Sequence, residues 1–507
     1  MVQATATTSE SGGETWSNRA AFMLAAIGSS VGLGNLWRFP FEAGQNGGGA
    51  FVLLYIVCVA LIGLPVLVTE LFVGRRGRKS AVGSVVVIAR AEGQSIWWSL
   101  QSWIGMLGAF IILTFYSVIA GWVIAYVVAL FGNLISQVIA NGPSAFLAGA
   151  FAGETSEEVT ARFVALLNDP MRMIAYHAVF MIVTVSIVAR GVKKGIEGTV
   201  KVLMPAFFVM LIVLLVFSLL QGDFGRAANF LFGIRLSDLF TGIADGSVIN
   251  AALGQAFFSI GLGSALMSTY GAYMAKDTDV PGSARVIAIA DTSVGIIAGL
   301  AIFPIVFAAG LDPAGGPALM FLTLPLAFQT MPFGAVFGLI FFCLGFFAAL
   351  TSSIALLETS TKWVDEQSSG NHRVASAMAL GTAAFVIGIA NALSQVPAGG
   401  GDGGATRDLF WNTFYPGGEF PLFLSNGAPM VLLDFLNELT NIILPVSGFI
   451  AAIFAGWVVS TSTAREAIGF QSDRWFNRWR FLVRYVCPIG IGAVIVYSAI
   501  IAPFFLS

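Results

Sequence analysis

Long apolar stretches alternate with short polar connections along almost the whole chain. Many of the stretches reach the ~20 residues that a helix needs to cross a bilayer. The pattern predicts eleven membrane-spanning helices, at 20–42, 47–73, 97–131, 172–190, 195–221, 246–275, 283–310, 333–365, 373–396, 430–458 and 481–505. Residues 1–16, rich in Thr, Ser and Gly, are predicted to form a disordered tail without the marks of a cleaved signal peptide.

Composition agrees with this pattern. The 507 residues are 57% hydrophobic and only 10% charged, whereas a soluble domain carries about 25% charged residues. The chain is therefore predicted to be an all-α polytopic protein of the cell membrane, with the lipid bilayer as its surroundings and no nucleic-acid partner.

The basic residues are unevenly placed between the two sides of the predicted membrane. If the N-terminus is cytoplasmic, 19 of the 25 Lys and Arg fall on the cytoplasmic side. Because short cytoplasmic connections favour Lys and Arg, this orientation is predicted. An odd number of spans then leaves the C-terminus outside.

Two predicted spans are interrupted by residues that helices avoid. The first contains "AAIGSSVGLGNLWRFPFEAGQNGGGAF" (25–51), and the sixth contains "GQAFFSIGLGS" (254–264). Broken helices at matching places in two inverted halves indicate a secondary transporter with a binding site near the membrane midplane. Glycine notches for helix packing are the alternative, but they do not explain Asn35, Arg38 or Ser259.

This symmetry divides the chain into predicted units. The disordered tail is followed by a first five-helix repeat at 17–225, an inverted second repeat at 226–460, and the last helix with a short C-terminus at 461–507.

The first break suits two kinds of ligand. Glycines at 28, 32 and 34 let the backbone leave helical geometry without a Cβ penalty. Unpaired carbonyls are costly in a membrane, and a hard cation such as Na⁺ can satisfy them. The half-helix that starts near Asn35 offers free N–H groups to a carboxylate.

These motifs resemble a known family. "SSVGLGNLWRFPFEAGQNGGGAF" is similar to the first helix of the neurotransmitter:sodium symporters, which include bacterial leucine and tryptophan transporters. The resemblance continues in the order of the family through "GLPVLVTELFVGR", "FYSVIAGW", "GQAFFSIGLGS", "AGLAIFP" and "FFAALTSSIALLE". It implies a five-plus-five inverted core with unwound helices one and six.

The resemblance implies two sodium sites and a neighbouring substrate pocket. The first sodium site would use Ser30, Asn35, Ser259 and Asp291, and the second Gly28, Val31, Ala348, Thr351 and Ser352. The implied pocket comprises Ser30, Leu33, Gly34, Ile112, Tyr116, Phe258, Ser259, Gly261, Ser264, Ser352 and Leu356. Without the family, the hydroxyls of "LTSS" would be read as bonding back to their own helix.

The pocket implied in this way favours an amino acid with a large apolar side chain. Gly261 and Ser264 stand where many amino-acid members carry a serine and a bulky residue, which predicts extra width near span six. Gly32 stands where monoamine transporters have an aspartate, so amines that lack a carboxylate are not expected as substrates.

The resemblance also implies gates and structural residues. The outer gate would pair Arg38 with Asp434, or alternatively with Glu438, above Tyr116 and Phe258; Glu366 would be the acidic side of the inner gate. Glu70 would brace the unwound segments, in protonated form, while Gly195 and Pro205 would let span five open.

The chain also departs from the family. Gly13 stands where the family commonly has the inner-gate arginine, and Arg19 is the candidate to take over that role. Gly295 replaces the serine that holds chloride in animal members, and Asp291 replaces a neutral asparagine. Since a carboxylate can balance the charge of sodium, chloride independence is predicted, although burial could instead keep Asp291 protonated.

Together these features predict a sodium-coupled symporter of a neutral, hydrophobic or aromatic α-amino acid, with no enzymatic activity and no organic cofactor. The alternatives are a non-transporting amino-acid sensor on the same scaffold, a membrane enzyme and an ion channel. The sequence leaves open the particular amino acid, the sodium stoichiometry and whether the chain forms an oligomer.

Overall fold

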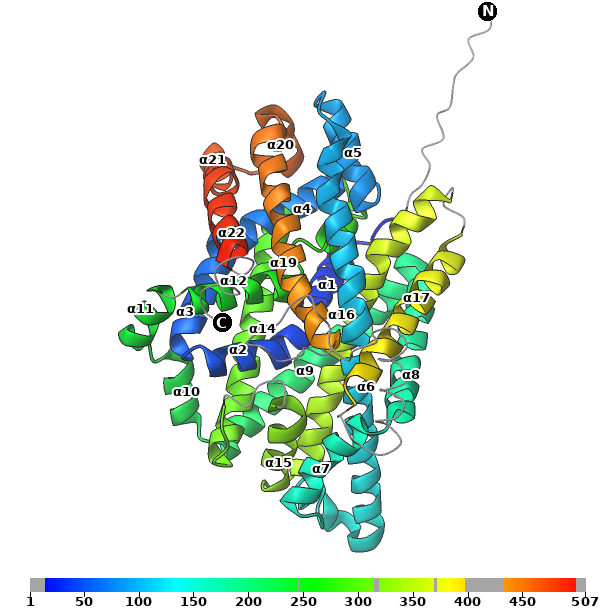
Figure 1. The fold of residues 1–507 in the computed structure, drawn as a ribbon, viewed down its shortest axis with the longest axis vertical. Coiled ribbons are helices and arrows are strands. Elements are labelled where there is room, and N and C mark those ends of the chain that lie inside the picture. The colour runs from blue at the N-terminus through cyan, green and yellow to red at the C-terminus, as the bar shows by residue number, and fades with distance from the viewer. Residues whose placement is uncertain (1–13, 245, 314–318, 369–371, 397–431, 498–507) are drawn as a thin grey trace, which may run out of the picture.

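A computed structural model describes residues 14–244, 246–313, 319–368, 372–396 and 432–497. Within these ranges the chain forms helices and no β-strand. Most of the helices run along the long axis of the molecule, with α1 (Arg19–Ser30) near the centre of the view in Figure 1. The all-helical architecture predicted from the hydrophobic pattern is confirmed.

Ten of the eleven predicted spans correspond to segments that are long and apolar enough to cross a membrane, counted over the described residues. One is a bent pair, Arg19–Ser30 followed by Gly34–Gln45. The other nine are Gly49–Gly77, Ile96–Leu147, Pro170–Ala189, Val192–Gln221, Val280–Ala308, Gly334–Gln367, Arg373–Ser394, Leu432–Val458 and Asp473–Val496. The sixth predicted span, 246–275, instead forms two short helices.

The helices within these spans have the following bounds. The α-helices are α2 (Phe39–Gln45), α3 (Gly49–Cys58), α4 (Leu64–Gly77), α6 (Leu100–Asn141), α8 (Pro170–Ala189), α9 (Gly198–Gln221), α14 (Val280–Ala308), α16 (Gly334–Gln367), α17 (Arg373–Ser394), α19 (Leu432–Ile453), α21 (Asp473–Phe481) and α22 (Cys487–Val496). Shorter π or 3-10 turns are η1 (Gly34–Arg38), η2 (Val59–Gly63), η3 (Ile96–Ser99), η4 (Gly142–Leu147), η5 (Val192–Glu197), η7 (Phe454–Val458) and η8 (Leu482–Val486).

Both predicted breaks are present. After α1 the backbone of Val31 is extended, and the two parts of the first span are bent by 45°. The sixth span consists of α12 (Ser247–Ile260) and α13 (Leu266–Ala272). Between them Gly261 has a φ of +74°, a left-handed conformation that glycine adopts at little cost, so α12 ends there.

The broken spans lie inside the bundle. α1 packs against α9, α14 and α16, while α12 packs against α3 and α13 against α4. α6 contacts α8, α16, α17 and α19, so it connects the broken spans to the outer helices. This burial is what places the non-helical backbone among other helices rather than in lipid, as the bilayer requires.

Two helices extend beyond their predicted ends. α6 continues through Gly132 to Asn141 instead of ending at 131, and it stops before Gly142, whose φ is +66°. The last span begins at Asp473 instead of 481, because the Ser472 hydroxyl caps its N-terminus. The charged stretch that was read as a connection is therefore helical.

Short helices connect the spans. They are α5 (Ala81–Ala91), α7 (Ser156–Leu167), α10 (Phe224–Phe232), α11 (Leu236–Ala244), η6 (Leu319–Thr323), α15 (Leu324–Gln329) and α20 (Thr461–Ile468). The predicted boundary between the two repeats, after residue 225, falls within α10. Residues 1–13 of the predicted tail and residues 397–431 lie outside the described residues.

Candidate functional site

A cavity lies where the two broken spans meet α6 and α16. It is lined by Ser29, Ser30, Gly32, Gly34, Ile112, Tyr116, Phe258, Ser259, Gly261, Ser264, Leu266, Ser352, Leu356 and Leu444. Ten of the eleven predicted pocket residues are in this set. The other one, Leu33, reaches the cavity wall through its amide, which donates a hydrogen bond of 3.0 Å to the Tyr116 hydroxyl.

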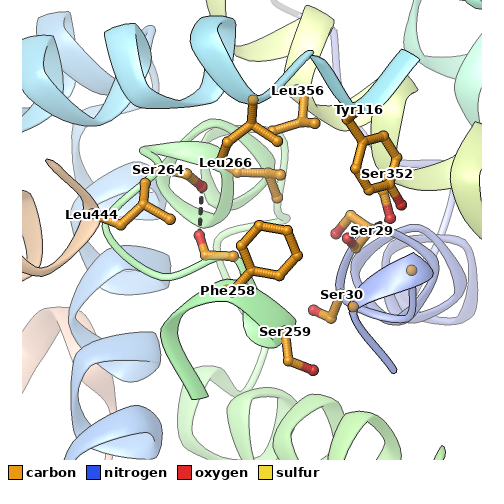
Figure 2. A pocket seen from close by; sticks show the side chains of 14 residues that line it. Ser29, Ser30, Tyr116, Phe258, Ser259, Ser264, Leu266, Ser352, Leu356 and Leu444 are labelled. Atoms are coloured by element: carbon orange, nitrogen blue, oxygen red, sulfur yellow. Dashed lines mark hydrogen bonds between the residues drawn. The ribbon is translucent and has the colours of Figure 1, made fainter. Parts of the chain in front are cut away.

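The two ends of the cavity differ in polarity. Figure 2 shows Tyr116 and Ser352 on one side, Ser264 and Leu444 on the other, and Leu266 and the Phe258 ring between them. The polar side also holds the backbone of the first break. The opposite side is mostly aliphatic, apart from Ser264, whose hydroxyl donates to the carbonyl of Gly261 at 2.5 Å.

The side chains predicted for the first sodium site converge beside this cavity. The Asn35 amide donates to the Ser259 hydroxyl at 3.0 Å and to a carboxylate oxygen of Asp291 at 2.9 Å. The Ser259 hydroxyl lies 2.8 Å from both Asp291 oxygens. All three side chains are buried, so their oxygens form a compact polar cluster of the kind that suits a hard cation.

Asp291 also accepts a hydrogen bond from Tyr55, a residue of α3 that the sequence analysis missed. The Tyr55 hydroxyl lies 3.2 Å from the second carboxylate oxygen. Gln255 was missed as well, and its amide donates to the carbonyl of Gly34 at 3.0 Å. Both are buried polar groups on spans that carry the family motifs, which is the signal that could have identified them.

The residues predicted for the second sodium site lie between α1 and α16. The Ser352 hydroxyl donates across the helices to the carbonyl of Ser29 at 3.2 Å. Thr351 bonds back to its own helix, at 3.1 Å from the carbonyl of Ala348, as the alternative interpretation of "LTSS" expected. A Cβ added to Gly28 would lie 3.5 Å from the Cβ of Thr351, so α1 at Gly28 is in direct contact with α16 at Thr351. Val31 is buried at the end of α1.

In this structure Arg38 contacts neither Asp434 nor Glu438 at ion-pair distance, so the outer-gate pairing stays a prediction. Its guanidinium forms an ion pair with Glu42 at 3.3 Å and donates to Asn441 at 3.1 Å. Glu42 is one turn away on the same helix segment, and Asn441 is two turns beyond Asp434 on α19. The guanidinium lies 4.7 Å from the centroid of the Phe258 ring, so it covers one wall of the cavity.

Of the residues predicted to have structural roles, Glu70 and Gly195 are buried and Pro205 is exposed. Glu70 accepts a hydrogen bond of 2.7 Å from the amide of Gly263, within the second break. Gly195 lies in η5, where an added Cβ would be 2.0 Å from the carbonyl oxygen of Ile187. Pro205 lies inside α9, one residue after Met204, whose sulfur is next to Gly28.

The predicted inner-gate acid, Glu366, faces other partners. It accepts a hydrogen bond of 2.8 Å from the amide of Ser80 and lies 3.8 Å from Lys79. These residues precede α5, so in this structure Glu366 holds the connection between spans two and three. Arg19 is exposed and has no ion pair with a described residue.

A different arginine holds the segment before α1. Arg373, at the start of α17, forms an ion pair of 2.9 Å with Glu14 and another with the buried Glu358. Glu358 in turn accepts a hydrogen bond from Tyr273, and the indole of Trp16 donates to the carbonyl of Tyr270 at 3.1 Å. In this structure the segment before α1 therefore supplies an acid to an ion pair with α17, and the gate role predicted for Glu366 stays a prediction.

Comparison with known proteins identifies the family. A model described as "Sodium:neurotransmitter symporter family" matches residues 13–138 and 166–400. Uncharacterized sodium-dependent transporter YhdH of Bacillus subtilis (strain 168) is 33% identical over 481 residues, which cover 94% of this chain and 95% of that protein. Sodium-dependent nutrient amino acid transporter 1 of Drosophila melanogaster is 24% identical over 548 residues, which cover 96% and 77%.

A solved structure agrees with this assignment. The crystal structure of MhsT in complex with L-phenylalanine is similar with a TM-score of 0.81 and 36% sequence identity, covering 96% of this chain and 100% of that chain. The resemblance found in the sequence motifs is therefore confirmed, and the chain belongs to the sodium:neurotransmitter symporter family.

Proposed function

We propose that this protein is a symporter that couples the sodium gradient to the import of a neutral α-amino acid with a hydrophobic or aromatic side chain, without chloride. The observation that carries the proposal is the cluster of Asn35, Ser259 and Asp291 directly beside a cavity with one polar and one apolar end. A zwitterion with an apolar side chain matches that distribution.

The polar end would bind the carboxylate of the substrate. The Leu33 amide and the Tyr116 hydroxyl, now bonded to each other, are donors that a carboxylate could engage. Na⁺ at the first site would lie next to the same carboxylate. Substrate and sodium would then stabilise each other, and this reciprocal dependence is what couples their movement.

The apolar end supports the proposed class of side chain. Ile112, Leu266, Leu356 and Leu444 line the cavity together with the Phe258 ring, and Gly261 has no side chain to fill the space beside them. In a pocket of this kind, binding becomes more favourable as the substrate's side chain buries more apolar surface. The phenylalanine bound by MhsT is consistent with such a substrate.

Asp291 supports the proposed independence of chloride. Two cations and a zwitterion in a site of low dielectric constant need a compensating negative charge. A carboxylate that touches Ser259 and Asn35 could supply that charge without an added anion.

Transport would proceed by alternating access. With the N-terminus cytoplasmic, the Arg38 side of the cavity would face outward and would close once sodium and substrate are bound. Opening to the cytoplasm would involve α1 and loosening of the helix around Pro205, because both contact the second sodium site through Met204 and Gly28.

Uptake of labelled amino acids into proteoliposomes, with and without an inward sodium gradient, tests this function. We expect sodium-driven accumulation of one or a few hydrophobic or aromatic amino acids. Sodium-dependent binding without accumulation would instead support a sensor, and neither binding nor uptake of any amino acid would refute the proposal.

The cavity should not tolerate a side chain at position 32. A Cβ there would lie 2.5 Å from the Ser352 hydroxyl oxygen and 2.9 Å from that of Tyr116. We therefore expect Gly32→Ala to weaken amino-acid binding by about 5-fold to 150-fold, the equivalent of about 1–3 kcal/mol of overpacking. Equilibrium binding of the transported amino acid measures this, with Gly132→Ala as control because no heavy atom is near that position. Parental affinity in Gly32→Ala would show that the cavity wall is misplaced.

Filling the apolar end should change substrate preference. Ser264 lines the cavity next to Leu266 and Leu444, so Ser264→Phe should favour smaller side chains over larger ones. Each methylene that no longer fits costs about 1–3 kcal/mol, or roughly 5-fold to 150-fold in relative uptake. Competition between small and large apolar amino acids in the same uptake assay measures the shift. A shift toward larger substrates would contradict this position for Ser264.

A further inference from the structure

The outer face of the last span carries a basic hollow that the transport site does not use. Arg474, Asn477, Arg478, Phe481 and Leu482 line a cavity of about 490 Å³ on α21 and η8. Their spacing of three and four residues places them on one face of a continuous helix. In Figure 1 this helix stands at one side of the bundle, at the same end as α5 and α20.

The opposite face of the same helix accounts for its anchoring to the protein. Arg480 donates to the carbonyls of Ala455 at 3.1 Å and Val459 at 2.8 Å, and the indole of Trp479 donates to the carbonyl of Pro65 at 3.1 Å. These groups are buried. The residues of the hollow are thus not required to hold the helix in place.

The two arginines of the hollow are not neutralised by described residues. Neither Arg474 nor Arg478 forms an ion pair with a described carboxylate, and the nearby Asp473 is paired with Arg465 at 2.5 Å. Arg478 lies 4.9 Å from the centroid of the exposed Trp475 ring. Two outward guanidinium groups beside an amide donor, Asn477, are suited to a phosphate group.

Along the helix the same face changes from basic to aromatic and then to aliphatic. Phe481 and Tyr485 follow the arginines, and Ile489, with 71% of its surface exposed, comes one turn later. Aromatic residues collect where a membrane meets water, and aliphatic residues face the acyl chains. The surface therefore matches a molecule with an anionic head and an apolar tail.

We propose that this hollow binds an anionic phospholipid, with the phosphate between Arg474 and Arg478 and the acyl chains along Phe481 and Ile489. A free anion would leave the apolar part of the surface unused. A second copy of the chain would bring two sets of unpaired arginines together, and their repulsion opposes a symmetric contact. Binding of the lipid does not depend on the proposed transport function.

Native mass spectrometry of the purified full-length protein in detergent tests this proposal. Phosphatidylglycerol is titrated as the anionic probe, with phosphatidylcholine of the same acyl chains as the neutral one. Each basic residue near a membrane surface raises the affinity for anionic lipid about fivefold, so Arg474→Gln/Arg478→Gln should bind phosphatidylglycerol about 25-fold more weakly than the parent. Phe481→Ala should weaken both lipids.

Controls separate this site from general attraction and from misfolding. Arg190→Gln/Arg285→Gln removes two other exposed arginines that lie outside the hollow, and it should weaken phosphatidylglycerol binding much less than Arg474→Gln/Arg478→Gln does. Amino-acid binding should be unchanged in all variants. Equal phosphatidylglycerol affinity in parent and Arg474→Gln/Arg478→Gln would overturn the proposal. Displacement of the lipid by inorganic phosphate, or a change in the fraction of dimer alone, would overturn it in favour of a free anion or a second copy.

Discussion

Asp291→Asn should abolish sodium-driven uptake at neutral pH. The Asp291 carboxylate is fully buried and accepts hydrogen bonds from Asn35, Ser259 and Tyr55. Interactions with a charged group are each worth about 1.5–3 kcal/mol, and asparagine keeps the shape but not the charge. Loss of about 3 kcal/mol would weaken sodium binding roughly 150-fold, which is enough to stop transport at ordinary sodium concentrations.

The measurement is the sodium concentration that gives half-maximal uptake, in chloride and in gluconate. The parent should transport equally well in both salts, and Asp291→Asn in neither. Asp279→Asn is the matched control, because Asp279 caps the start of the same helix and asparagine caps equally well. A parent that needs chloride, or a variant with parental sodium dependence, would refute charge compensation by Asp291.

Residues of the breaks were predictable because their chemistry conflicts with their surroundings. Glycine, serine and asparagine within an apolar span indicate a site, and the cavity indeed gathers Ser30, Gly34 and Ser259. Leu266 and Leu444 also line the cavity, but leucine is an ordinary residue in an apolar span and gives no such indication. They line the cavity because the break between α12 and α13 lies against α19, with Gly263 beside the carbonyl of Leu444, and only the folded chain determines this contact.

The sequence indicated that a charged residue in a span has a function, but it did not indicate which residue that side chain contacts. Arg38 was identified as a functional residue, but its contact with Asn441 depends on the rotation of α19 about its own axis. Arg373 was not identified at all. Its ion pair with Glu14 joins residues 359 positions apart, and a lone arginine at the start of a span is an ordinary sequence feature.

Arg373→Gln should shift the protein toward the cytoplasm-open form of the proposed transport cycle. The guanidinium lies between Glu14 and Glu358, and the side chain of Glu358 has no exposed surface. Removing one partner of a buried ion pair costs about 3–5 kcal/mol because the other charge is left uncompensated. In the open form water would reach Glu358 and solvate its charge, so the substitution destabilises mainly the closed form. The ratio of closed to open protein should therefore fall by about 150-fold or more.

Hydrogen–deuterium exchange over residues 14–30, in sodium-containing buffer, measures this ratio. The amides of α1 and the preceding segment should exchange about 150-fold faster in Arg373→Gln than in the parent, because exchange proceeds through the open form. Arg19→Gln is the control, since Arg19 is an exposed arginine of the same region whose side chain has no ion pair with a described residue.

A second substitution distinguishes loss of the Arg373 ion pairs from a general loss of packing around position 373. In Arg373→Gln/Glu358→Gln the uncompensated charge is gone, and the amide of position 358 can still accept a hydrogen bond from the Tyr273 hydroxyl. Replacing both partners of a buried pair by neutral groups costs far less than removing one. The double variant should therefore recover most of the parental protection. Slow exchange in Arg373→Gln, or equally fast exchange in the double variant, would show that the ion pairs of Arg373 do not hold the inner side closed.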